Sequence, residues 1–228
     1  MAELRQRILF VLGALVVFRI GTHIPIPGVD PSAVAAMFAQ TRGSIIDIFN
    51  MFSGGALKRL SILALGVMPY ISASIIIQMM SSIIPQLEQL KKEGESGRRK
   101  ITQYTRYGTV GLATFQALGI AIAIEGQQAG GGPVVLIPGI GFKITTVATL
   151  VTGTMFLVWL GEQISERGIG NGISLIIFGS IVAGLPSAVA GTLELARTGT
   201  FSPIGVLALF IGAIAITAAV VFVERGPR

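Results

Sequence analysis

Residues 50–57 read NMFSGGAL and residues 67–74 read VMPYISAS, and these two stretches decide the fold. The first is a short amphipathic segment that ends at two glycines and is followed by the charges Lys58 and Arg59. The second opens a long apolar helix with Pro69 close to its start. A half-inserted element that leads into a spanning helix is a way for membrane proteins to line cavities, so we expect more than a simple membrane anchor.

The composition indicates a protein that is solvated mainly by lipid. Of its 228 residues, 52% are hydrophobic and 12% are charged, whereas a soluble domain carries about 25% charged residues. The chain has 30 glycines, and small residues in membrane helices mark close helix contacts. It has no cysteine, which excludes disulfides, thiolate metal sites and cysteine nucleophiles within it.

Six segments are apolar enough, or nearly so, to cross a bilayer, which takes about 20 residues. The predicted spans are about 5–23, 61–84, 107–124, 144–161, 171–190 and 202–223. The expected fold class is therefore all-α, a polytopic membrane helix bundle. Most Lys and Arg residues then fall on the amino-terminal side of the membrane, so the positive-inside rule places both ends of the chain in the cytoplasm. Arg19 interrupts the first span near one end. Its side chain could either snorkel to the membrane interface or face the protein interior.

The segment 44–57 has an apolar bias but is too short to span. One interpretation is an interfacial helix that lies on the outer leaflet. The other is a re-entrant element tucked into a cavity, with Gly54 and Gly55 as its flexible hinge. We expect Pro69 in the first turn of the next helix, where its missing N–H costs nothing.

Two further parts of the chain carry groups of polar or charged residues. Ser74 and Gln78 belong to a polar stripe on the second predicted span, and such residues usually face other helices or water. Residues 91–100 form the main basic segment, which we expect to be a loop between spans. It has two interpretations: a topology determinant beside anionic lipid, or a docking surface for an acidic or RNA-containing cytoplasmic partner.

The sequence argues against an enzyme. Ser96 lies in a GESG stretch that matches the short serine motif of intramembrane rhomboid proteases, but this stretch is a polar basic segment. His23 is the single histidine and falls on the opposite side of the membrane, out of reach of Ser96. The glycines of residues 161–172 look like a phosphate loop, but no strand precedes them; we expect a turn there, with Asn171 capping the next helix. No catalytic residue, metal site or cofactor is expected.

Five stretches together resemble the SecY family, the pore subunit of the bacterial protein-conducting translocon. They occur in family order over nearly the whole chain and are residues 24–28, 50–57, 68–78, 91–107 and 153–178. The resemblance implies a channel built from two five-helix halves that are related as an inverted repeat. This chain would supply the first half and one further helix, because the family has ten helices and the sequence ends just after a sixth.

The resemblance also implies roles for particular residues. A short plug helix follows the first span in the family, matching about residues 44–57; its residues here are Asp47, Phe49, Asn50, Met51, Phe52, Ser53, Gly54 and Gly55. A ring of aliphatic side chains closes the channel waist, and this half would supply Val67, Ile71, Ile173 and Ile177. The second and third spans form one side of a lateral gate, where Ser74 and Gln78 are expected to stabilise the closed state.

The implied function is conduction of unfolded secretory polypeptides across the bacterial plasma membrane, and of membrane segments sideways into lipid. The implied partners are SecE, SecG, the SecA motor or a translating ribosome, a preprotein with its signal sequence, membrane lipid and the remaining helices of the pore. The expected cytoplasmic docking residues are Lys91, Lys92, Arg98, Arg99, Lys100 and Arg167. The alternative is a small-solute secondary transporter, which needs convergent polar or charged groups within its spans.

Overall fold

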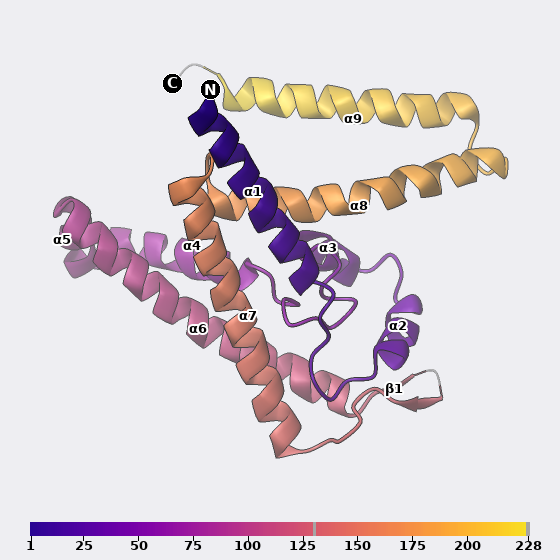
Figure 1. The fold of residues 1–228 in the computed structure, drawn as a ribbon, viewed down its shortest axis with the longest axis horizontal. Coiled ribbons are helices and arrows are strands. Elements are labelled where there is room, and N and C mark those ends of the chain that lie inside the picture. Colours follow the sequence, from indigo (N-terminus) through magenta and orange to yellow (C-terminus); the bar gives the residue numbers. More distant parts are fainter. Residues whose placement is uncertain (130, 227–228) are drawn as a thin grey trace. The chain divides into compact units, whose positions relative to one another are not determined.

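The computed structural model describes residues 1–129 and 131–226, which form two compact units (Figure 1). The first unit is Met1–Ile181, and the second begins at Val182. The described helices are α1 (Ala2–Gly21), α2 (Pro31–Ala39), α3 (Ile45–Phe52), α4 (Met68–Ile83), α5 (Pro85–Lys92), α6 (Glu95–Glu125), α7 (Ile140–Arg167), α8 (Gly172–Arg197) and α9 (Pro203–Glu224). One small antiparallel hairpin of β1 (Gln128–Ala129) and β2 (Gly132–Pro133) is the exception to the all-α expectation.

The first unit is organised around the packing of α6 against α7 and α4. The buried face of α6 carries small residues at every fourth position, and small side chains let helix backbones approach closely. These residues are Thr105, Thr109, Ala113, Ala117 and Ala121, all of them buried. The alanines share one hydrophobic cluster with Leu150 of α7 and with the loops that precede α2 and α4.

Two glycines allow backbone segments to meet α7. A Cβ atom added at Gly153 would collide with the carbonyl oxygen of Ile62, and one added at Gly172 would collide with that of Gly161. Since any other residue brings a Cβ, these positions require glycine as long as the backbones stay this close. Gly153 thereby lets residues 61–67 pack closely against α7. Gly172 lets the start of α8 pack closely against α7 at Gly161.

The prediction of a continuous second span over 61–84 is wrong at its start, whereas its end agrees with the end of α4 at Ile83. Residues 61–67 form turns, and α4 begins only at Met68, with Pro69 in its first turn as expected. Ser61 ties these turns to the protein because its hydroxyl donates to the carbonyl oxygen of Gly21, at 3.2 Å, and accepts from the amide of Leu63, at 3.0 Å. At the other end Ile84 precedes a proline, which disfavours helical backbone, and the chain bends by 101° into α5.

Four described helices are long and apolar enough to cross a membrane: α6, α7, α8 and α9. The bent pair of α4 and α5 makes a fifth if it is one broken span. The α1 helix has 20 residues and is not among these four, because Arg5, Arg7 and Arg19 are spread over nearly its whole length and leave no long uncharged stretch. The chain is therefore a multi-pass membrane protein, and α1 stays a predicted span.

The second unit consists of the carboxyl-terminal part of α8 and all of α9. The hydroxyl of Ser202 caps α9 by accepting from the amide of Gly205, at 3.1 Å, and Pro203 occupies the first turn. Nearly every large apolar side chain of α9 is exposed, Val206 being the buried exception. Such a surface fits a lipid environment.

Candidate functional site

The α3 helix is a short amphipathic element that no other element covers. Its 8 residues include no buried one. Ile45, Ile48, Phe49 and Met51 expose large apolar side chains, with Ile45 71% exposed. The helix therefore presents an apolar face outward and is joined to the first unit through its ends.

The carboxyl-terminal end of α3 folds back on the residues that follow it. The side-chain oxygen of Asn50 accepts from the backbone amide of Lys58, at 2.9 Å, and the hydroxyl of Ser53 accepts from the amide of Leu57, at 3.2 Å. The Lys58 ammonium pairs with the Asp47 carboxylate. This ion pair, together with the amide of Gly43, lowers the pKa of Asp47 below its ordinary value. Residues 47–58 thus form a closed local fold.

Gly54 and Gly55, predicted as the flexible hinge of a re-entrant element, form a hydrogen-bonded turn in this structure. Both adopt the left-handed backbone that glycine tolerates, with φ of 69° and 86°. The Gly54 amide donates to the carbonyl of Met51, at 3.2 Å, and the Gly55 amide to that of Asn50, at 2.9 Å. Gly54 is also buried against Ser180 of α8, whose Cα lies 3.4 Å from the position of an added Cβ. The pair forms a packed, hydrogen-bonded turn.

Arg19 reaches this same turn. Its Nη1 donates to the carbonyl oxygen of Gly54 at 2.6 Å, so the side chain faces the protein interior and does not snorkel. The guanidinium of Arg59 lies beside Gly55, with its Nη1 3.2 Å from the position of an added Cβ. Partial burial lowers the pKa of Arg59, and the nearby charge of Arg19 lowers it further. The sequence alone left both orientations of Arg19 open, and an arginine near the end of an apolar helix was the signal that it has a polar partner.

The four aliphatic residues expected in the waist meet in one hydrophobic cluster. Val67, at the amino-terminal cap of α4, is buried, and Ile71, Ile173 and Ile177 are half-buried around it. The cluster also contains the buried Ile176, which the sequence analysis did not single out. Residues far apart in the sequence therefore form one hydrophobic cluster, which is mostly aliphatic, contains Phe18, and includes Ala56 of the turn that follows α3.

Ser74 and Gln78 lie one turn apart on α4. Ser74 is half-buried and Gln78 is exposed. The Gln78 backbone carbonyl accepts from the hydroxyl of Ser81 at 2.6 Å. Within residues 1–129 and 131–226 no hydrogen bond involves either the Ser74 or the Gln78 side chain, so both remain available for other groups.

The basic segment is helical, and the prediction of a loop over 91–100 is wrong. Lys91 and Lys92 end α5, and α6 begins at Glu95, so Arg98, Arg99 and Lys100 lie in its first turns. Only the short connection at residues 93–94 separates the two helices. Two helices fix the backbone positions of these residues, whereas a loop would leave them variable.

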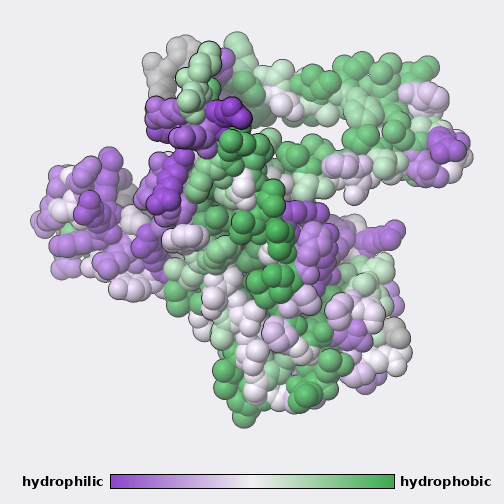
Figure 2. All heavy atoms as spheres, in the orientation of Figure 1, coloured by the Kyte–Doolittle hydropathy of each residue, from purple (hydrophilic) through white to green (hydrophobic). Residues whose placement is uncertain are grey.

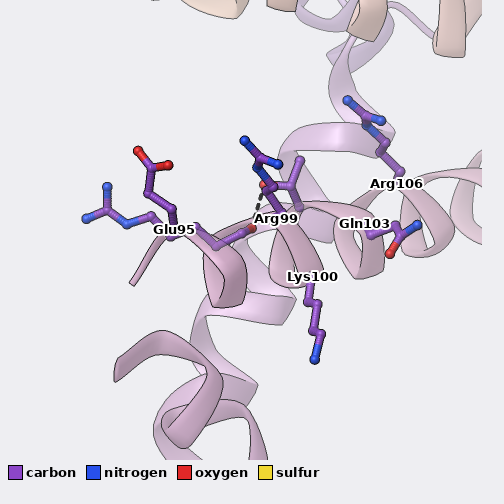
Figure 3. A pocket seen from close by; sticks show the side chains of 7 residues that line it. Glu95, Arg99, Lys100, Gln103 and Arg106 are labelled. Carbon is purple, nitrogen blue, oxygen red and sulfur yellow. Dashed lines mark hydrogen bonds between the residues drawn. The ribbon is translucent and has the colours of Figure 1, made fainter. Parts of the chain in front are cut away.

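The cations of early α6 line an open hollow of about 520 Å³ (Figure 3). Its residues are Glu95, Arg98, Arg99, Lys100, Thr102, Gln103 and Arg106. Arg106 pairs with Glu162 of α7 at 2.6 Å, which brings the end of α7, including the exposed Arg167, to the same end of the unit. Figure 2 shows hydrophilic residues gathered over α5 and the start of α6. The expected docking residues therefore share one polar end.

The groups weighed for enzyme chemistry do not form a site. Ser96 lies at the start of α6, and the Nδ1 of His23 lies 2.8 Å from the carbonyl oxygen of Arg19, with no hydrogen bond between Ser96 and His23. In the described part of the chain no three His, Asp or Glu side chains are placed to hold a metal ion. Asn171 does cap α8, as predicted, by accepting from the amides of Ile173 and Ser174 at 3.0 and 3.3 Å.

These features define a class: a polytopic α-helical membrane protein with a buried hydrophobic cluster beside a short amphipathic element. The family model of SecY matches residues 61–228, and the chain belongs to the SecY family. It is 60% identical over its whole length to the protein translocase subunit SecY of Escherichia coli K12 and covers 51% of that protein. It is 55% identical to the SecY subunit of Pseudomonas aeruginosa, covering 50% of it. The chain thus spans about half the length of these curated relatives.

Two solved structures share the fold. One is described as the structure of a protein conducting channel, and the other as Sec61 in the canine ribosome-channel complex from the endoplasmic reticulum. Each superposes with a TM-score of 0.55 at 16% identity and covers 93% of this chain. The chain covers 41% of the first and 42% of the second. At this identity the likeness establishes the channel fold alone.

Proposed function

We propose that the chain supplies the amino-terminal part of the central pore of the Sec translocase. The pore would conduct unfolded secretory polypeptides across the bacterial plasma membrane and release membrane segments sideways into lipid. The observation that carries the proposal is the aliphatic cluster of Val67, Ile71, Ile173 and Ile177 beside the α3 segment, in a chain of the SecY family.

The chemistry of the cluster suits a channel waist. Aliphatic side chains offer no fixed hydrogen bonds, so they let varied polypeptide side chains pass. In the resting state an apolar constriction excludes ions because water leaves it. The α3 segment, Asp47 through Gly55, would be the plug on the outer side of this waist, and the exposed apolar face of α3 would lie against the rest of the pore.

A lateral gate is the second part of the proposal. The packed pair of α4 and α6 would form one wall of the gate. The unpaired side chains of Ser74 and Gln78 would stabilise the closed gate by bonding to the opposite wall. We expect that replacing both with leucine changes how strictly the channel selects signal sequences, and unchanged selection in an export assay would refute this role.

Partners and orientation complete the proposal. SecE would clamp the pore, SecG would lie beside this half, and the SecA motor or a translating ribosome would dock on the cytoplasmic side. The polar end that carries Lys91, Lys92, Arg98, Arg99, Lys100 and Arg167 supports this docking, because clustered cations attract acidic or RNA-containing surfaces. Both ends of this chain would then be cytoplasmic.

Site-specific photocrosslinking tests the waist directly. A photoreactive residue at Ile71 of the full-length gene product is expected to crosslink to a stalled secretory chain, because the half-buried Ile71 borders the proposed conduit. Val110, on the exposed side of α6, is the matched control and is expected to give no crosslink. A stable stalled complex without crosslinks from Ile71 would remove this cluster from the conduit.

A small-solute transporter is not favoured. Such a protein needs convergent polar groups to hold its solute and coupling ion, whereas the cluster around Val67 is hydrophobic. Polar substitution separates the two functions: Ile71→Asn is expected to raise resting ion leak in a gated pore, whereas a transporter would lose solute uptake.

A further inference from the structure

Arg19 is a charged residue on an apolar helix, and its guanidinium donates a hydrogen bond to a backbone carbonyl. Its Nη1 lies 2.6 Å from the carbonyl oxygen of Gly54, and among the described residues no carboxylate forms an ion pair with it. Hydrogen bonds from a charged donor are shorter and stronger than neutral ones. The contact joins positions 35 residues apart in the sequence, so it links α1 to the end of the α3 segment.

Three elements converge on Gly54. Its amide bonds within its own turn to Met51, its carbonyl accepts from Arg19 of α1, and its α-carbon packs on Ser180 of α8. Gly54 is buried as a result. The carboxyl-terminal end of α3 is therefore held by the body of the first unit.

The amino-terminal end of α3 is attached less firmly, through the ion pair of Asp47, in its first turn, with Lys58 of the same segment. The described hydrogen bonds of the linker, residues 40–44, stay within residues 37–47, as in the bond from the Ser44 hydroxyl to the carbonyl of Thr41, at 3.1 Å. Gly43 has φ of 82°, and a Cβ added there would meet open space. Because α3 itself has no buried residue, the Gly54 end is its main anchor to the protein.

We propose that Arg19 is a positioning residue that holds the plug at Gly54 and so sets how tightly the resting channel is closed. This inference rests on the proposed function. When the contact between Arg19 and Gly54 breaks, the α3 segment moves away from the first unit. The linker at residues 40–44 permits this movement because its hydrogen bonds are local. Arginine suits the task because its guanidinium has five donors and keeps its charge at all physiological pH values.

The test compares three variants of the full-length gene product in its native complex, reconstituted into a planar bilayer without substrate. Arg19→Gln removes the charged donor, and we expect the resting ion conductance to rise about tenfold, the order that a hydrogen bond to a charged group contributes. Arg19→Lys keeps a charged donor and is expected to restore part of the closure. Arg42→Gln removes a nearby exposed charge that forms no described contact and is expected to match wild type.

A second readout follows the plug itself. The described chain has no cysteine, so a cysteine at the half-buried Phe52 reports on this site once any others in the gene product are replaced. We expect a water-soluble maleimide to label Phe52→Cys faster in the Arg19→Gln background than in the Arg42→Gln background. Unchanged conductance and unchanged labelling in Arg19→Gln, or in Arg19→Ala should the first variant not accumulate, would overturn the inference.

Import of a secretory polypeptide into vesicles that contain the wild-type complex is measured in parallel. If wild type imports nothing, the proposed function itself fails. If wild type imports normally while the Arg19 variants stay closed and unlabelled, only the role of Arg19 fails.

Discussion

Residues 45–52 and residues 53–67 are adjacent and both apolar, yet they fold in opposite ways. The first form the regular helix α3 without a buried residue. The second form turns without an α-helix, yet Ala56, Leu60 and Leu63 within them are almost fully buried. The comparison teaches that local pattern alone made the helix, whereas contacts with distant residues fixed the turns.

The largest expected loss of stability comes from truncating a buried side chain in residues 53–67. Leu63 is 1% exposed, so Leu63→Ala leaves a cavity and is expected to destabilise the protein by about 2–5 kcal/mol. Ile45 is 71% exposed, so Ile45→Ala is the matched control, expected to change stability by less than about 0.5 kcal/mol. Thermal unfolding of the detergent-purified gene product measures both. Equal losses would mean that α3 is as firmly packed as the turns.

The next effect targets the close approach of the turns to α7. Gly153→Ala places a methyl group against the carbonyl of Ile62, and we expect a loss of about 1–3 kcal/mol from overpacking. Gly141→Ala, on the same helix with open space around it, is the control and should be neutral or slightly stabilising. The same unfolding assay applies, and a neutral Gly153→Ala would show that residues 61–67 can move away at little cost.

A smaller loss of stability is expected from removing the hydrogen bond that joins α3 to the turns that follow it. Asn50→Ala removes the acceptor for the Lys58 amide and is expected to cost about 1 kcal/mol locally. The segment should then open more often, which limited proteolysis in membranes detects as faster cleavage within residues 40–58. Met51→Ala, on the exposed face, serves as control. Slower or unchanged cleavage of Asn50→Ala would contradict a closed local fold.

The smallest effect concerns the ion pair of Asp47 and Lys58. The pair lowers the pKa of Asp47, so its stabilisation is present above the ordinary value of 3.8 and is lost as pH falls through the lowered value. We expect wild type to resist cleavage slightly better than Asp47→Asn from neutral pH down to about pH 4, with the difference vanishing under stronger acid. The proteolysis assay with an acid-stable protease checks this, and a difference that grows on acidification would contradict the sign.

Much of the fold follows from the sequence because it depends on local composition. The runs around 107–124, 144–161 and 202–223 are apolar enough for spans whatever surrounds them, and helices α6, α7 and α9 cover them. Pro69 and Asn171 act within one turn of their own position, so their places at helix starts were predictable. The roles of the waist, plug, gate and docking residues came from family resemblance and stay predictions.

Other features depend on partners far away in the chain. The start of α4 at Met68 depends on α1 and α7, because Ser61 bonds to Gly21 and Gly153 admits Ile62. The periodicity of residues 61–67 could not reveal those partners. The basic residues of 91–100 were predicted as a loop from their charge alone, although polar residues continue a helix readily when it extends beyond the lipid.

The sequence by itself determined that the chain is a multi-pass helical membrane protein of the SecY type, because lipid demands long apolar helices and the motifs are local. Only the tertiary structure decided that Arg19 faces inward to Gly54, that the two glycines are packed, and that Val67, Ile71, Ile173 and Ile177 meet in one cluster. Each of these depends on residues tens of positions apart, whose proximity is set by helix packing and cannot be read from periodicity.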